Sequence, residues 1–105
     1  MDNKLEIDGF EWDKGNLIKS FTKHGVTFLE AEEAFWNEPL LYFPDEKHSF
    51  TEKRLIAFGK TNKKRLLTIA FTLRIKGPTT LIRVISARPM HRKEKIIYEK
   101  TISET

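Results

Sequence analysis

The segment from Ile82 to Lys95 carries the residues of this sequence that are best suited to chemistry. Apolar residues in its first half are typical of a strand, Arg83 and Arg88 interrupt them, and a basic stretch follows directly. Five Arg and Lys side chains occur within the 13 residues from Arg83 to Lys95. Cationic groups that a sheet brings into one region can hold a phosphodiester. The segment therefore predicts a site for a phosphate-containing ligand.

Three arginines are candidates for that site. Arg54 opens a predicted strand, Arg83 lies within another, and Arg88 follows directly after it. Side chains alternate across a strand, so a spacing of five places Arg83 and Arg88 on opposite faces. They converge only if the strand bends or ends before Arg88, and Pro89 favours such an ending. The hypothesis requires the guanidinium groups to meet in one exposed concavity free of carboxylates. A solvated or ion-paired sheet arginine is the competing interpretation.

Lys23 and His24 form a second candidate group, in the last turn of a predicted helix. An imidazole exchanges protons near neutral pH and is a common general acid or base. A histidine at this position can equally act as a helix cap, because cations suit the C-terminal end of the helix dipole. The residues alone leave both interpretations open. His48 and His91 are interpreted as surface residues.

A basic run near the C-terminus supplies further candidates for contact with an anionic chain. Tyr98 follows Glu94 by four positions and therefore shares its helix face. A charge run on a helix is more often simply a solvated face, and this alternative stays open. The candidates are Arg92, Lys93, Lys95 and Tyr98.

Several classes of chemistry have no support in the sequence. There are no cysteines, which excludes disulfides and thiolate metal sites. The three histidines lack the spacing of a metal site, and no glycine-rich phosphate loop or Gly-x-Ser-x-Gly motif occurs. We therefore expect neither a metal nor a cofactor.

The composition is that of a folded domain with a basic surface. The chain has 105 residues, 39% hydrophobic and 32% charged, with a formal net charge of +4. This length suits one domain over residues 1–105, with its core at about 10–100. A pI near 9.4 favours an anionic partner such as nucleic acid or an acidic protein. No apolar run approaches the ~20 residues of a membrane helix, and the first residues lack the apolar region of a signal peptide. We expect a cytoplasmic protein without membrane contact.

Helical patterns occur in the first third and at the end of the chain. Residues 13–36 read as two short helices that Gly25 separates. A last helix is predicted from about Pro89, which suits the first helical position, to about Lys100. The residues of this helix expected to dock on the sheet are Met90, Ile96 and Ile97.

Strand patterns occupy the middle of the chain. The alternation in Phe10–Trp12 is enough for a brief strand. Leu40–Phe43 is a short apolar run, and Pro44–Ser49 is a polar loop. Three longer strands are predicted at Arg54–Gly59, Arg65–Leu73 and Thr79–Ala87. The fold class is therefore α+β, with a sheet of about four antiparallel strands against two N-terminal helices and one C-terminal helix.

Taken in order, these blocks resemble the BrnT family of toxins from bacterial type II toxin–antitoxin modules. The resemblance covers roughly residues 10–100, and the Trp-Asp, Lys-His-Gly and Ile-Ser-Ala-Arg blocks together make it specific. The matching blocks are Phe10-Glu11-Trp12-Asp13, Lys23-His24-Gly25-Val26, Glu30-Ala31, Arg54, Gly59, Arg83-Val84-Ile85-Ser86-Ala87-Arg88, Arg92-Lys93-Glu94 and Tyr98-Glu99.

The resemblance implies a RelE-like ribonuclease fold, a sheet with helices packed on one side. It also implies an RNA-cleaving activity that halts translation. The partner would be a cognate BrnA-type antitoxin with a DNA-binding domain, so that DNA is contacted only through the complex.

We predict metal-independent RNA cleavage, in which the ribose 2′-OH attacks the adjacent phosphorus and expels the 5′-oxygen. Preorganised arginines would stabilise the charge that builds on the phosphoryl oxygens, and a nearby side chain would transfer the proton. The predicted catalytic residues are Lys23, His24, Arg54, Arg83 and Arg88. Those predicted to bind flanking RNA are Arg92, Lys93, Lys95 and Tyr98.

Two other functions use the same basic surface. A non-catalytic module that binds RNA or an acidic protein would show salt-sensitive binding without cleavage. A small DNA-binding regulator has less support, because no helix-turn-helix pattern is evident.

Overall fold

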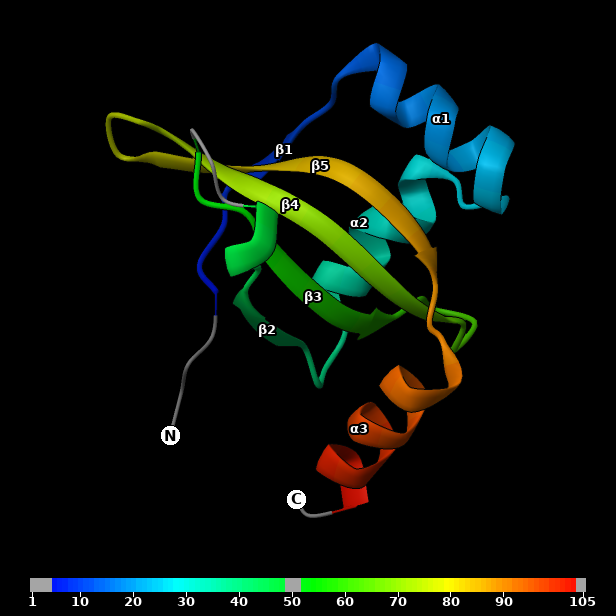
Figure 1. Cartoon of the computed structure of the whole chain (residues 1–105). Helices are drawn as coiled ribbons and strands as arrows, with labels where there is room; N and C mark the ends of the chain where they lie inside the picture. Colours follow the sequence, from blue (N-terminus) through cyan, green and yellow to red (C-terminus); the bar gives the residue numbers. More distant parts are fainter. Residues whose placement is uncertain (1–4, 49–51, 104–105) are drawn as a thin grey trace.

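A five-stranded mixed sheet forms the centre of the structure, with the strands in the order β1-β5-β4-β3-β2 (Figure 1). The computed structural model describes residues 5–48 and 52–103. β1 pairs with β5 in parallel, whereas the other neighbours are antiparallel. The strands are β1 (Gly9–Glu11), β2 (Leu41–Pro44), β3 (Leu55–Lys60), β4 (Leu66–Lys76) and β5 (Thr79–Pro89).

The predicted sheet of about four antiparallel strands is therefore wrong in number and direction. The brief strand near Phe10 exists as β1, but its partner is β5, some seventy residues later in the chain. The sequence of a three-residue strand does not indicate which strand it pairs with or whether the pairing is parallel or antiparallel. The apolar run at Leu40–Phe43 becomes the edge strand β2. The polar loop after it contains a short 3₁₀ turn, η1 (Glu46–His48), and Ser49 lies outside the described residues.

The two N-terminal helices form as predicted, α1 (Lys14–His24) and α2 (Phe28–Trp36). Gly25 ends α1 in the left-handed conformation, with φ of 66°, which glycine adopts without steric cost. Thr27 and Glu30 form a capping box at the start of α2. Gly59 allows α2 to pack closely on the sheet, since a Cβ there would lie 2.6 Å from the Ala34 carbonyl oxygen.

Helices cover both faces of the sheet, not one face as the resemblance implied. The larger core packs α2 against one face, and Ala57 of β3 belongs to it. The adjacent Phe58 points the other way, into a smaller cluster with Met90 and with Tyr98 of α3 (Arg92–Ser103). Figure 1 shows α2 behind the sheet and α3 extending from the end of β5.

The last helix starts later and docks through other residues than predicted. Pro89 still pairs with Leu67 at the end of β5, so the helix begins only at Arg92. Met90 is buried as expected, but Ile96 and Ile97 are 57% and 53% exposed. Tyr98 faces the sheet instead, one turn after Glu94. The expected docking of the two isoleucines is therefore wrong.

Strands β4 and β5 form a longer hairpin than predicted. The expected link at residues 74–78 shrinks to Gly77 and Pro78, because β4 continues to Lys76 and β5 begins at Thr79. Gly77 has φ of 62°, a conformation that tight hairpin turns require and glycine supplies.

Candidate functional site

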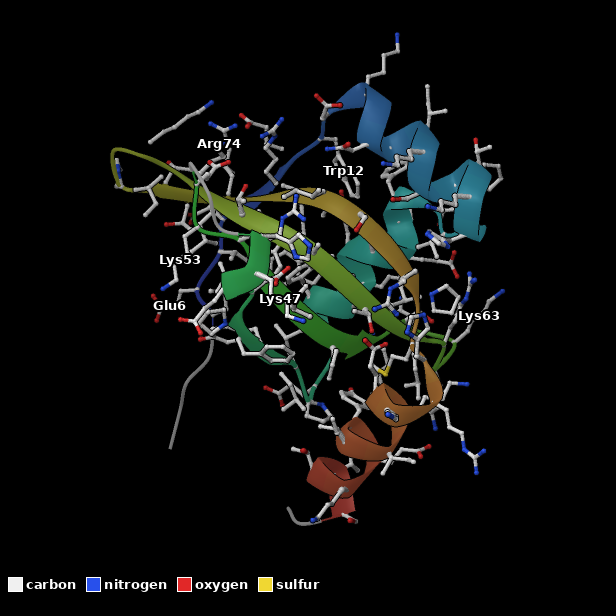
Figure 2. The ribbon with its side chains drawn as sticks, viewed as in Figure 1. Glu6, Trp12, Lys47, Lys53, Lys63 and Arg74 are labelled. Atoms are coloured by element: carbon white, nitrogen blue, oxygen red, sulfur yellow. The ribbon has the colours of Figure 1, made fainter. Side chains whose placement is uncertain are left out.

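A cavity of about 320 Å³ lies on the face of the sheet opposite α2. Figure 2 shows this face in front, with Lys47 of η1 lying over it. The lining residues come from α1, η1, the segment before β3, and strands β4 and β5. They are Asn16, His48, Glu52, Arg54, Thr72, Arg83 and Ile85.

Arg54 and Arg83 meet in this cavity, although 29 positions separate them in the sequence. Arg54 precedes β3, whose even-numbered residues Ile56 and Phe58 lie on the face away from α2. Arg83 pairs with Thr72 across the β4–β5 ladder. The structure thus brings together two of the three predicted arginines.

The cavity is not free of carboxylates, so that part of the hypothesis is wrong. Glu52 lines it, with its carboxylate 3.9 Å from Arg83 Nη1 and 3.7 Å from Arg74 Nε. Asp13 lies 3.7 Å from Arg83 Nη2. All three separations exceed the length of an N–H···O hydrogen bond. Among the described residues, Asp13 and Glu52 are near enough to offset the charge of Arg83 but too far away to accept hydrogen bonds from its N–H groups.

A β-bulge resolves the alternation problem between Arg83 and Arg88. In the register Ala70 pairs with Ser86 and Phe71 with Val84, so Ile85 is the extra residue. Arg83 then faces Thr72 and Arg88 faces Thr68, which puts both arginines on one side of the sheet. The strand does not end before Arg88, because β5 continues to Pro89. The bulge is instead the local bend that the sequence argument named as its other condition. Thr68 and Thr72 are four positions apart on β4, so the two arginines are still separated by about 13 Å.

Arg88 is occupied by the base of α3. Its Nη1 and Nη2 donate to Glu94 Oε1 and Oε2, each at 2.8 Å. Glu94 also accepts from the Thr68 hydroxyl at 2.9 Å and from the His91 N–H at 2.8 Å. Burial opposes ionisation of the carboxyl, but these hydrogen bonds, that of Arg88 first, lower the pKa of Glu94 to about 2. Arg88 therefore ties α3 to the sheet.

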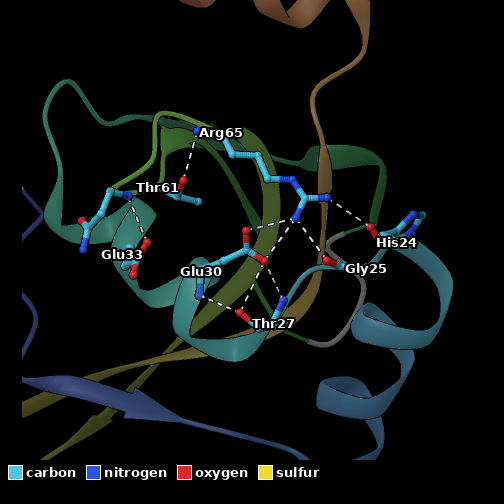
Figure 3. A network of polar contacts seen from close by, with 8 residues as sticks. His24, Gly25, Thr27, Glu30, Glu33, Thr61 and Arg65 are labelled. Atoms are coloured by element: carbon cyan, nitrogen blue, oxygen red, sulfur yellow. Dashed lines mark hydrogen bonds and ion pairs between the residues drawn. The ribbon is translucent and has the colours of Figure 1, made fainter.

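Lys23 and His24 lie at the far end of α1 from the cavity. Asn16 and His24 are eight residues apart, which is about 12 Å along a helix. The turn after His24 is held by Arg65, which donates to the carbonyls of His24 and Gly25 and to Glu30 (Figure 3). Burial, followed by repulsion from Lys23, Arg88 and His91, lowers the pKa of the His24 imidazole. The structure does not bring these two residues to Arg54 and Arg83.

His48 is the cavity residue that sequence reasoning missed. Its Nδ1 lies 2.9 Å from Asp45 Oδ2, three positions earlier in the same short loop. The sequence does contain a signal, an acidic residue three positions before a histidine in a polar segment ahead of Arg54. The spacing alone does not indicate a site, because His48 reaches the cavity only through the folding of this loop over the sheet.

Thr72 is a second cavity residue that the sequence did not single out. Its side chain is 2% exposed, and its Oγ1 has no hydrogen-bond partner among the described residues. A buried hydroxyl without a partner is costly, and most such groups in folded proteins are satisfied. Thr72 lines the cavity, so a polar ligand that reached this hydroxyl would satisfy it.

The residues predicted to bind flanking RNA divide into two groups. Arg92, Lys93 and Lys95 are exposed on α3. Tyr98 is fully buried, and its hydroxyl donates to the Pro39 carbonyl at 2.6 Å. Burial raises the pKa of Tyr98 to about 12. The prediction that Tyr98 contacts RNA is corrected, because no part of its ring is accessible to a base.

Within residues 5–48 and 52–103, no group of three or more His, Asp or Glu side chains is arranged to hold a metal ion. No helix in the same part of the chain has the length and apolar character needed to cross a bilayer.

Comparison with known proteins identifies relatives of this fold. Residues 12–94 match the family model described as "Ribonuclease toxin, BrnT, of type II toxin-antitoxin system". The fold is similar to the 1.1 Å crystal structure of the ribonuclease toxin BrnT from Brucella abortus, with a TM-score of 0.57 and 24% sequence identity. That match covers 80% of this chain and 97% of the Brucella chain. Comparison with curated proteins gave no match.

Proposed function

The chain belongs to the BrnT family, ribonuclease toxins of type II toxin–antitoxin systems, and we propose that its cavity is the site where RNA is cleaved. The reaction is metal-independent: the ribose 2′-OH attacks the adjacent phosphorus, and the 5′-oxygen leaves. Cleavage of cellular RNA then inhibits translation in the cytoplasm. The RelE-like fold that the resemblance implied stays a prediction.

The observation that carries this proposal is the convergence of Arg54 and Arg83 on one cavity with a buried, unsatisfied hydroxyl. Negative charge grows on the non-bridging phosphoryl oxygens as the 2′-oxygen attacks. Guanidinium groups already aimed at that position stabilise the transition state without having to reorganise. The volume of about 320 Å³ lies at the lower end of the range for small-molecule sites, which suits one nucleotide unit of a longer chain.

The other predicted catalytic residues take different places in the proposal. Arg88 is held by Glu94, and His24 lies at the opposite end of α1, so neither enters the chemical step. Lys23 joins Arg92, Lys93 and Lys95 as a cation that attracts the flanking RNA backbone. The protein partner is an antitoxin of the BrnA type, through which any contact with DNA is made.

The test is cleavage of RNA by the purified protein and by two matched variants. Arg83→Gln removes a cavity guanidinium, and we expect kcat/KM to fall by about 10²-fold or more, as for loss of one preorganised donor. Arg74→Gln is the control, because Arg74 approaches the same Glu52 but does not line the cavity. We expect it to keep activity within about threefold, and circular dichroism checks that both variants fold.

Two outcomes would contradict the proposal. Equal activity of Arg83→Gln and wild type would remove the cavity from the mechanism, and loss of activity with EDTA would overturn metal independence. Salt-sensitive RNA binding without any cleaved product would instead support the non-catalytic binding module.

A further inference from the structure

We propose that His48, oriented by Asp45, is the residue that removes the proton from the attacking 2′-OH. The inference rests on the proposed function, because it assigns a role within the same cavity. It replaces the prediction that Lys23 or His24 transfers the proton.

The contact between Asp45 and His48 defines which imidazole nitrogen faces the substrate. An ionised carboxylate can only accept a hydrogen bond, so the Nδ1 atom 2.9 Å from Asp45 Oδ2 must carry the hydrogen. In the neutral ring Nε2 then holds a lone pair. An imidazole fixed in this tautomer by an acidic residue is the arrangement that general bases use in nucleophilic catalysis. The His48 side chain is 56% exposed, so an RNA strand can reach it.

The backbone couples this pair to the phosphate-binding arginine. The Asp45 N–H donates to the Arg54 carbonyl at 2.8 Å, and the His48 N–H donates to the Asp45 carbonyl at 3.2 Å. The imidazole, its orienting carboxylate and Arg54 are therefore held by one connected set of hydrogen bonds. Such coupling is what a base needs if it must stay in register with a bound phosphate.

Thr72 of β4 lines the same cavity as His48. Its hydroxyl has no hydrogen-bond partner among the described residues. The ligand class that meets this hydroxyl, two guanidinium groups and one imidazole is a phosphodiester with a neighbouring sugar hydroxyl. Among the residues that the structure describes, the charged groups that contact the imidazole or line the cavity with it are Asp45, Glu52, Arg54 and Arg83.

The chemical step balances without any further reactant. His48 Nε2 takes the proton from the 2′-OH as the O2′–P bond forms and the P–O5′ bond breaks. The imidazolium then returns that proton to the departing O5′, directly or through one water. The products are a 2′,3′-cyclic phosphate and a 5′-hydroxyl, with Arg54 and Arg83 stabilising the charge on the phosphoryl oxygens between the two transfers.

The experiment compares single-turnover RNA cleavage by wild type, His48→Gln and His91→Gln. We expect His48→Gln to lose about 10²–10⁴-fold in rate, the usual contribution of general acid–base catalysis. His91→Gln is the matched control, since this histidine is exposed and lies outside the cavity; it should stay within about twofold. Added imidazole should restore part of the activity of His48→Ala, which a purely structural role would not allow.

Two further variants sharpen the assignment. Asp45→Asn should lower the rate and change the shape of its pH profile, because the amide can stabilise the wrong tautomer. Thr72→Val should lower activity while leaving the free energy of unfolding unchanged or higher, because it removes a buried hydroxyl that has no partner among the described residues.

The outcomes separate this inference from the proposed function. If wild type cleaves, Arg83→Gln does not, and His48→Gln stays within threefold of wild type, His48 is not the base and the proposed function survives. If wild type cleaves no RNA, both are overturned. Large loss in His48→Gln with rescue of His48→Ala by imidazole supports both.

Discussion

The cavity and the base of α3 each place an arginine of β5 on the same face of the sheet, and they use it in opposite ways. Arg83 and Arg88 have side chains that are equally exposed, at 28%. The two N–H groups of Arg88 each donate at 2.8 Å to one carboxylate, whereas the carboxylates near Arg83 stand 3.7 and 3.9 Å away. Residue type and exposure therefore do not distinguish a structural arginine from one that is free to bind a ligand. The state of its hydrogen bonds does.

The largest effect on stability should come from Glu94. Glu94→Ala removes the acceptor for Arg88, Thr68 and the His91 N–H together. We expect the free energy of unfolding to fall by about 2–3 kcal/mol, since hydrogen bonds to charged groups are the stronger kind. Glu52→Ala, at the cavity, should cost less than about 1 kcal/mol because its ion pairs are long and partly exposed. Urea denaturation measures both, and equal losses would erase the distinction between the two regions.

Acid should weaken the α3 end of the molecule specifically. Folding holds the pKa of Glu94 at about 2, below its ordinary value of 4.5. Its stabilisation is therefore complete above about pH 4.5 and is lost as the pH falls from 4.5 towards 2. The difference in free energy of unfolding between wild type and Glu94→Gln should shrink across that window. Urea titrations from about pH 7 down to about pH 2 test this, and curves that stay parallel would contradict it.

The smallest changes in stability and RNA binding are expected from substitutions on the two sides of α3. Tyr98→Phe removes the hydrogen bond to the Pro39 carbonyl and should cost about 1 kcal/mol of stability without changing RNA affinity. Lys93→Ala should leave stability unchanged and weaken RNA binding, and the salt dependence of the binding constant should become shallower by about 0.7 in log–log slope if Lys93 pairs with one phosphate. Fluorescence anisotropy at several salt concentrations measures the binding. Weaker RNA binding by Tyr98→Phe would contradict this assignment, because it would show that the Tyr98 hydroxyl contributes to RNA binding.

The sequence was a good guide wherever a local signal determined the outcome. Gly25 marked the division between the two N-terminal helices correctly, because a helix cap acts within a few residues. The three longer strands were also predicted, because the apolar runs and turn residues that mark a strand are likewise local signals. The parallel pairing of β1 and the second covered face depend on contacts between distant segments, which no local pattern encodes.

The candidate site was predicted only in part, for a comparable reason. Arg54 and Arg83 were correctly grouped, but a bulge at Ile85 decides the faces of Arg83 and Arg88, and no glycine marks it. The prediction placed the wrong face of α3 against the sheet. Glu94 and Tyr98 face the sheet with their polar atoms in hydrogen bonds, whereas Ile96 and Ile97 remain exposed. His48 was not predicted as a site residue, because its position in the cavity depends on its contact with Asp45 and on a loop that folds across the sheet.

The bulge at Ile85 also has a consequence for how this surface can change by insertion or deletion. On either side of the bulge, the residues of β5 alternate regularly between the two faces of the sheet, but the alternation shifts by one residue at Ile85. Close to the bulge, the Ala87 N–H donates to the buried Ser20 hydroxyl of α1. Loss of Ile85 itself would remove the bulge and restore regular alternation, which leaves Arg83 opposite Thr72 and Arg88 opposite Thr68 on the same face. A change of one residue that leaves the bulge in place would instead invert one half of the strand and carry Arg83 or Arg88 into the apolar interior. The bulge and the number of residues between the two arginines can therefore change only together.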